Sequence, residues 1–345
     1  MHPTLLVGPY DWDPERLPTS EFVERIRRFR QEISNEDCAA AIIYGDSANH
    51  AELVYLSHFV PKLGPAVMLI PRSGEPRLLA SGAPNMLAAA KRLTWIEDVE
   101  PLRDAGKTIG RWLNESTDLA RGASGRRLAL IGEEYMPAAF HRPLMETLSG
   151  EIHPVNVTPR LRQLMRYKSP TEVVFICDAC AILDAAAKAL IDAHRACTGI
   201  TAAVIEAERV ALQLGAQDVR SLFSVDGGRT LRPFQAPINS SVDPLQAYIA
   251  VKHIGYWVEG FLCFSGTQHP AREKAAGVLR AVLPRATAGT RGGELARLVG
   301  ESIKPYIAHP ITGRSIGNGM GLSIEEEPQL SLDNEATFEA GCVYT

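Results

Sequence analysis

The stretch that decides the fold is Gly317-Asn318-Gly319-Met320-Gly321-Leu322-Ser323-Ile324-Glu325-Glu326-Glu327-Pro328. Its first half is rich in glycine and its second half is acidic. Taken alone, the three glutamates are compatible with a solvated acidic loop. The alternative, a pocket that contains at least Glu325, depends on what the rest of the chain places around this stretch.

Upstream of this stretch, two apolar runs predict a β-hairpin. Residues 247–251 and 256–265 flank His253-Ile254-Gly255, a short turn-forming segment. Glu259 lies inside the second run between apolar neighbours. A carboxylate buried there without a partner costs several kcal/mol, so we expect Glu259 to have a partner, which the sequence does not identify.

Helices are predicted on both sides of the hairpin. Ser169-Pro170-Thr171-Glu172 combines a capping serine, a proline at the first helical position and a glutamate three residues after the cap. The helix that starts there is expected to reach about residue 197, and a second covers residues 202–214. Two more helices are expected over residues 270–283 and 292–307.

The amino-terminal part alternates strand and helix patterns, which predicts an α/β domain over residues 1–155. A linker is expected over 156–168 and a second domain over 169–345. The predicted strands of the first domain are residues 38–44, 53–56, 66–70 and 128–131, and its predicted helices are residues 21–33, 84–92 and 105–113.

Composition limits the kinds of protein this chain can be. A length of 345 residues suits two domains, and a net charge of -4 with interspersed signs argues against a nucleic-acid or membrane partner. No apolar run approaches the roughly 18–20 residues that span a bilayer. The start of the chain lacks the pattern of a secretion signal, so a cytoplasmic location is expected.

The six cysteines are scattered over the chain and do not form a disulfide framework. Cys177 and Cys180 have the spacing of a redox or metal motif. No second such pair and no Cys–His cluster is nearby, and both residues fall on a predicted helix with apolar neighbours. We interpret them as ordinary helix residues.

Five segments, in the same order, resemble motifs of the creatinase, prolidase and Xaa-Pro aminopeptidase (M24) superfamily. The glycine-rich stretch aligns without gaps on the family pattern G-H-G-x-G-L-x-x-H-E-x-P, which favours the pocket role for Glu325. The other four are Leu161-Arg162 with Lys168-Ser169-Pro170-Thr171-Glu172, Gly255-Tyr256 with Glu259, residues 49–59, and residues 341–345.

This resemblance implies the fold and the assembly. The fold class is α/β (α+β), with a creatinase-like α/β domain followed by a pita-bread domain that carries a curved antiparallel sheet. The last strands of that domain would lie beyond Thr345. Relatives are commonly homodimers, so a homodimer is expected.

The resemblance also implies positions for two metal ions, and these positions carry different residues here. The first carboxylate position falls on Tyr248, the second on Glu259 and the histidine position on Asn318, while two further glutamates would lie beyond Thr345. Hard divalent cations prefer carboxylates and imidazole to a phenol or an amide. We therefore expect no metal and no other cofactor.

Two further positions of the family site have changed as well. A histidine that contacts substrate is replaced by Arg314, and the histidine of the H-E-x-P element is replaced by Glu325. Residues 222–242 contain no histidine, so the acid–base histidine of creatinase has no counterpart. Arg314 offers a planar fork for two-point binding of a substrate carboxylate.

The remaining polar residues suggest acid–base chemistry. Closely placed carboxylates raise one another's pKa, so Glu259 and Glu325 are predicted as the catalytic pair. His253 is expected to be an exposed turn residue; in the alternative, Lys252 and His253 join the site. The predicted substrate-binding residues are Arg314, Asn318, Tyr248 and Glu326.

Three functions remain open on this reasoning. The first is a metal-independent hydrolase that cleaves a C–N bond in a small amide, amidine or amino-acid-like substrate, with that small molecule as its partner. The second is a non-catalytic pita-bread binding module. The third is a metal-dependent Xaa-Pro peptidase.

Overall fold

The computed structural model describes residues 10–62, 64–115, 126–148, 152–196, 199–226, 230–233, 238, 242–268, 270–303 and 316–345. The chain divides into two compact units, Met1–Met165 and Arg166–Thr345. None of the described helices is both long and apolar enough to cross a lipid bilayer.

The first unit contains a six-stranded mixed sheet with the order β4-β3-β2-β1-β5-β6. Strands β2 and β3 form the antiparallel hairpin that the turn-rich segment after residue 70 predicts, whereas β5 and β6 are parallel. The strands are β1 (Cys38–Gly45), β2 (Ala66–Pro71), β3 (Arg77–Ala80), β4 (Asp98–Pro101), β5 (Arg126–Ile131) and β6 (Ile152–Asn156).

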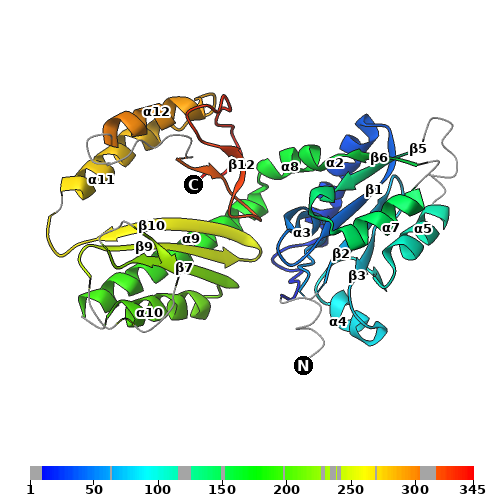
Figure 1. Ribbon diagram of the computed structural model, residues 1–345, viewed down its shortest axis with the longest axis horizontal. Helices are drawn as coiled ribbons and strands as arrows, with labels where there is room; N and C mark the ends of the chain where they lie inside the picture. The colour runs from blue at the N-terminus through cyan, green and yellow to red at the C-terminus, as the bar shows by residue number, and fades with distance from the viewer. Residues whose placement is uncertain are drawn as a thin grey trace. The chain divides into compact units, whose positions relative to one another are not determined.

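Helices cover both faces of this sheet (Figure 1). On one face, Ile42 and Leu130 pack with Trp112 of α5 and Phe140 of α7. Because side chains alternate along a strand, the buried Ile43 points to the other face, where α2 and α3 contact β1. The helical elements are α2 (Thr19–Asn35), α3 (Ala51–Ser57), η1 (Pro84–Met86), α4 (Leu87–Lys91), α5 (Ala105–Glu115), η2 (Glu133–Tyr135), α7 (Ala138–Leu148) and α8 (Thr158–Arg166).

Two details differ from the sequence-based expectation. The apolar run over residues 53–56 was predicted as a strand, but it forms α3, in which every residue is buried. A short, fully buried apolar run has no polar alternation to distinguish helix from strand, so periodicity alone cannot decide. The second difference is that the expected linker, residues 156–168, contains helix α8.

The second unit is built on a four-stranded antiparallel sheet with the order β10-β9-β7-β8. Strands β9 and β10 form the predicted hairpin, and its turn residues Ile254 and Gly255 both have positive φ, at 48° and 86°. The elements are α9 (Pro170–Arg195), α10 (Ile200–Gln213), β7 (Asp218–Ser224), β8 (Arg232–Pro233), β9 (Leu245–His253), β10 (Tyr256–Phe264), α11 (Pro270–Val282), η3 (Leu283–Arg285), α12 (Gly292–Ile303), β11 (Asn318–Gly319) and β12 (Glu326–Gln329).

The start of α9 has the geometry that its sequence predicts. The Ser169 side chain accepts a hydrogen bond from the Glu172 amide, the Glu172 carboxylate accepts one from the Ser169 amide, and Pro170 occupies the first turn. This capping box is confirmed. Cys177 and Cys180 are exposed, unbonded thiols on the same helix.

Candidate active site

The two faces of the β7–β9–β10 sheet have different environments. Helices α9 and α10 lie against one face (Figure 1), where Phe175 of α9 contacts Tyr256 with ring centroids 6.0 Å apart. Leu183 of the same helix lies against Gly260. By strand alternation, the odd-numbered residues of β10 and the even-numbered residues of β7 and β9 point to the opposite face, which we call the site face.

Polar and aromatic residues cluster on the site face. Antiparallel pairing places Arg220 beside Ala250 and Ala250 beside Glu259, so the small alanine lies between a guanidinium and a carboxylate. The neighbouring rows carry the Tyr248–Phe261 pair on one side and the Asp218–Lys252–Trp257 row on the other.

Tyr248 and Glu259 form the central contact of the cluster. The Tyr248 hydroxyl donates to Glu259 Oε2 over 2.5 Å. Burial, followed by the hydrogen bond and the negative charge of Glu259, raises the pKa of Tyr248, and the charge of Glu325 acts in the same direction. Arg220 opposes the shift. The partner that Glu259 was expected to need is therefore Tyr248, and the phenol keeps its proton.

Lys252 is the buried cation of the site face, with a residue exposure of 5%. Its Nζ lies 5.6 Å from the centroid of the Trp257 ring, and the Arg220 guanidinium lies 4.6 Å from the centroid of the same ring. Burial lowers the pKa of Lys252 from its ordinary 10.5 to about 8; Asp218 counteracts this shift and Arg220 adds to it.

This shift predicts how stability depends on pH. Lys252 loses its proton near pH 8 in the folded chain but near 10.5 in the unfolded chain. Between these values the unfolded state binds more protons, so the wild type becomes more stable as pH rises. Between about pH 7 and about pH 9.5, the free energy of unfolding of the wild type should rise by about 2 kcal/mol more than that of the Lys252→Met variant. Urea denaturation of both proteins across this pH range measures the difference. Parallel curves for the two proteins would contradict the burial of a charged Lys252.

His253, the next residue, does not share this position. It was expected to be an exposed turn residue, which is wrong: its exposure is 8%, and its Nδ1 lies 2.9 Å from the Gly215 carbonyl oxygen. Strand alternation turns it toward the end of α10 and away from the site face. Of the two residues in the alternative prediction, only Lys252 lies on the site face.

Asn318 lies at the base of the glycine-rich loop and is buried. Its Nδ2 donates to the carbonyl oxygens of Gly319, over 2.7 Å, and of Ile324, over 3.0 Å. The Trp257 amide in turn donates to the Gly321 carbonyl over 2.8 Å, which fastens this loop to the start of β10. The substrate-binding role of Asn318 stays a prediction, and these contacts show that its amide NH₂ joins two parts of the loop.

Glu326 was also predicted to bind substrate, and its carboxylate is instead engaged inside the protein. Its Oε2 lies 2.8 Å from Lys168 Nζ, with side-chain exposures of 12% for Glu326 and 2% for Lys168. Its Oε1 accepts from the Ser323 amide over 3.3 Å. A Cβ at Gly321 would lie 2.5 Å from Lys168 Nζ, so the third glycine of the stretch leaves room for this ion pair.

Glu325 differs from its neighbour, because its side chain is exposed. It is nevertheless close enough to the site face for its charge to raise the pKa of Tyr248. Arg314, the predicted substrate-binding arginine, lies outside the described residues. Among the residues that the structure describes, no three His, Cys, Asp or Glu side chains gather in the way that a metal ion requires.

Comparison with known proteins identifies the N-terminal domain and the overall fold. Residues 25–166 match the family model for the creatinase/prolidase N-terminal domain. The whole chain has the fold of an X-Pro aminopeptidase from Thermotoga maritima, with a TM-score of 0.72 and 19% identity over 92% of this chain and 88% of that one. Residues 25–166 thus match a creatinase/prolidase N-terminal domain, and the chain as a whole shares the fold of these peptidases. No curated protein matches it by sequence.

Two other solved structures show the range of proteins that share this fold. A prolidase from Pyrococcus horikoshii has a TM-score of 0.69 and 17% identity over 93% of this chain and 89% of that one. The N-terminal domain of the FACT complex subunit SPT16 from chickpea (Cicer arietinum) has a TM-score of 0.67 and 16% identity over 94% of this chain and 87% of that one.

The pita-bread domain brings together residues that sequence reasoning had missed. Tyr248 and Glu259 were expected as separate site residues, but their hydrogen bond was not. Arg220 and Trp257 were not predicted for the site at all. Only Asp218-Val219-Arg220 alternates polar and apolar residues, which is too short a signal to identify β7, and its pairing with β9 is what places Arg220 on the same row as Glu259.

Proposed function

We propose that this chain is a metal-independent hydrolase that cleaves a C–N bond in a small amide, amidine or amino-acid-like substrate. The observation that carries this proposal is the Tyr248–Glu259 hydrogen bond on the site face, at the two positions where a metal-dependent relative carries carboxylate ligands. The related structures include peptidases that act beside proline, which supports a hydrolase-type activity.

The donor set does not fit a two-metal centre. The Tyr248 hydroxyl donates its proton to Glu259, and its pKa is raised, whereas a phenol must lose its proton to bind a cation well. Asn318 directs its amide NH₂ to backbone carbonyls. One carboxylate, Glu259, therefore remains of the three aligned ligand positions within the chain.

The Tyr248–Glu259 pair suits acid–base catalysis of hydrolysis. Glu259 takes a proton from a water molecule, and the water oxygen attacks the carbon of the C–N bond. Tyr248 gives its proton to the departing nitrogen, and the proton held by Glu259 then passes to Tyr248 along their hydrogen bond. Water is thus added across the bond, and both side chains return to their starting states.

Cations on the site face would orient an anionic group of the substrate. Arg314 was expected in this role from the sequence, and Arg220 is a described alternative. Its guanidinium packs against Trp257 and lies on the same row of the sheet as Glu259. A planar guanidinium held against an aromatic ring is well placed to bind a carboxylate through two hydrogen bonds.

Loss of the acid–base pair should abolish turnover without unfolding the chain. Glu259→Gln and Tyr248→Phe are each expected to lower kcat by at least about 100-fold, the usual range for a lost proton-transfer group. Turnover is measured by mass spectrometry on a panel of small amides, amidines and Xaa-Pro dipeptides. The control is Glu206→Gln, which removes an exposed carboxylate paired with Arg209 on α10.

The same panel tests the chemistry of the site. Turnover is expected to persist in the presence of a chelator, and purified protein is expected to lack stoichiometric Mn, Co or Zn. Undiminished turnover by Glu259→Gln would refute the acid–base proposal. Bound stoichiometric metal together with chelator-sensitive cleavage of Xaa-Pro dipeptides would favour the metal-dependent peptidase.

A binding module is the second candidate, and two observations favour it. The fold also occurs in the N-terminal domain of a FACT complex subunit. In addition, Phe261 is 74% exposed on the site face, beside Tyr248. If the wild type turns over nothing on the panel but binds peptides in a manner that Phe261→Ala abolishes, the binding module is the better description.

A further inference from the structure

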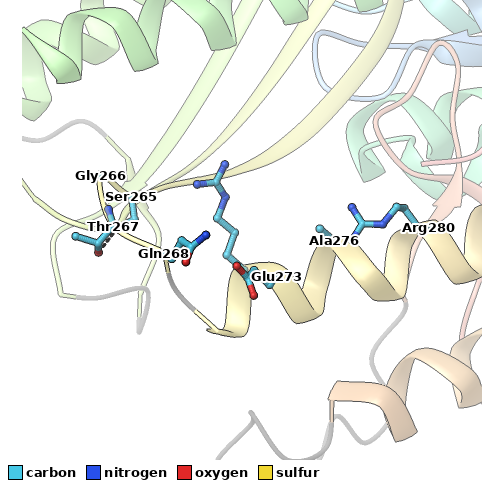
Figure 2. A pocket seen from close by; sticks show the side chains of 8 residues that line it. Ser265, Gly266, Thr267, Gln268, Glu273, Ala276 and Arg280 are labelled. Carbon is cyan, nitrogen blue, oxygen red and sulfur yellow. Dashed lines mark hydrogen bonds between the residues drawn. The ribbon is translucent and has the colours of Figure 1, made fainter.

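Two adjoining cavities of about 640 and 560 Å³ lie where β10 passes into α11. Ser265, Gly266 and Arg272 line both, so the two form one groove, which we call the β10–α11 groove. Figure 2 shows the first cavity, with the segment that follows β10 on one side and helix α11 on the other. Ser265 is six residues beyond Glu259 on the chain, roughly 20 Å along an extended strand, so a small substrate cannot occupy both places.

Helix α11 presents two arginines to this groove. Arg272 and Arg280 are exposed, and neither has an ion-pair or hydrogen-bond partner within the described part of the chain. Eight residues separate them, which corresponds to about 12 Å along the helix, with the small Ala276 midway on the same side. The helix therefore offers two guanidinium groups with open space between them.

The second cavity adds a third arginine and a buried histidine. The Arg195 guanidinium lies 4.7 Å from the centroid of the Phe264 ring, and the His194 ring meets the same ring edge-on at 6.0 Å. His194 lines the cavity with an exposure of 7%, and its buried Nδ1 has no hydrogen-bond partner among the described residues. This nitrogen is shielded from solvent, so the histidine shapes this end of the groove and Arg195 supplies its charge.

The charge of the groove favours an anion. Three arginines line it, of which Arg195 is also paired with Asp192 over 3.6 Å, and the lining includes the two carboxylates of Asp243 and Glu273. Arg272 and Arg280 are the two guanidinium groups that have no such partner among the described residues. Planar guanidinium groups match the geometry of phosphate and carboxylate oxygens, and hydrogen bonds of this kind are about twice as strong as neutral ones. The spacing along α11 suits a ligand with several anionic groups better than a single small ion.

We infer that the β10–α11 groove binds a small polyanion, a molecule with two or more neighbouring phosphate or carboxylate groups. Arg272 and Arg280 hold its anionic groups from α11, and Arg195 binds oxygen atoms at the other end of the groove. This site is separate from the Tyr248–Glu259 pair and does not depend on the proposed hydrolase activity.

Calorimetric titration of the full chain at constant ionic strength tests this inference. The probes are inorganic tripolyphosphate, citrate and orthophosphate. Saturable binding of tripolyphosphate or citrate is expected, at one ligand per chain and at least tenfold tighter than that of orthophosphate. Arg272→Ala and Arg280→Ala should each weaken it about tenfold, as for a lost charge-assisted contact. Both residues are exposed, so neither change should unfold the chain.

Two controls make the result decisive. Arg209→Ala removes the same charge from an exposed position on α10 and should leave the affinity unchanged. Glu259→Gln should also leave it unchanged, which separates this site from the proposed hydrolase. A preference for tripolyphosphate identifies a phosphate ligand and a preference for citrate a carboxylate ligand. Absence of saturable binding by both, or an equal loss in Arg209→Ala, overturns the inference.

Discussion

Replacing Glu326 with glutamine should lower the free energy of unfolding of the second unit by about 3–5 kcal/mol. Glu326 and Lys168 form an ion pair 2.8 Å long, and the Lys168 side chain is only 2% exposed. Glutamine keeps the size of the side chain but removes its charge. The buried ammonium would then lose the carboxylate that it faces, and this loss costs far more than the pair itself contributes to stability.

The neighbouring residue provides a matched control for this experiment. Glu325→Gln removes the same charge one position earlier, where the side chain is exposed, and should change stability by less than about 0.5 kcal/mol. Replacing both partners, as Lys168→Met with Glu326→Leu, should restore most of the loss because no unpaired charge remains. Calorimetry follows the unfolding. Equal stability of the Glu325→Gln and Glu326→Gln proteins would show that the ion pair has no structural role.

Removing the carboxylate of Glu172 should destabilise the second unit by about 2–4 kcal/mol. One oxygen accepts the Ser169 amide at the start of α9, and the other accepts the Tyr256 hydroxyl over 2.9 Å. Tyr256 is 1% exposed, so in Glu172→Ala its buried hydroxyl would lose this acceptor. The loss therefore combines a broken buried hydrogen bond with a lost helix cap.

A double-mutant cycle separates these two contributions. Tyr256→Phe removes the hydroxyl, and in the Glu172→Ala background it should recover the part of the loss caused by the unbonded donor. The part caused by the cap should remain. Chemical denaturation followed by circular dichroism measures both. Strict additivity of the two substitutions would contradict the hydrogen bond between them.

The residues in these two predictions belong to the sequence motifs. Their contacts show that the motifs stabilise the second unit. Lys168 and Glu172 belong to the segment before α9, Tyr256 to the hairpin and Glu326 to the glycine-rich stretch. In the folded chain they bond to one another across 84 and 158 residues of sequence. These motif residues are thus largely the ones that hold the scaffold beneath the site.

Much of the fold was predictable because its signals are local. The capping box of Ser169 and Glu172, the β9–β10 hairpin and the β2–β3 hairpin each depend on residues a few positions apart. The prediction of a strand at residues 53–56 was wrong because this short segment carries no local signal that distinguishes helix from strand. A buried apolar run satisfies helix and strand equally well until its neighbours in the fold are known.

The site was predictable only in part. Tyr248 and Glu259 were predicted as separate site residues, and their side chains form a direct hydrogen bond. Asn318 and Glu326 were expected in the same pocket, but each is occupied by scaffold contacts. Arg220 escaped prediction because its strand pairs with β9 across the sheet, and no local pattern records that pairing.

The glycine-rich stretch from Gly317 to Pro328 shows which properties of this protein follow from its sequence alone and which depend on the tertiary structure. The sequence by itself determined the resemblance to the superfamily motifs, the positions of turns and helix starts, and the predicted replacement of ligand residues by Tyr248 and Asn318, because these depend on residue types and short spacings. Only the tertiary structure decided that Glu259 bonds Tyr248, that Glu326 bonds Lys168 and that Lys252 faces the site while His253 does not. Those outcomes depend on strand register, on side-chain alternation and on contacts between distant segments, where a shift of one residue reverses which face a side chain occupies.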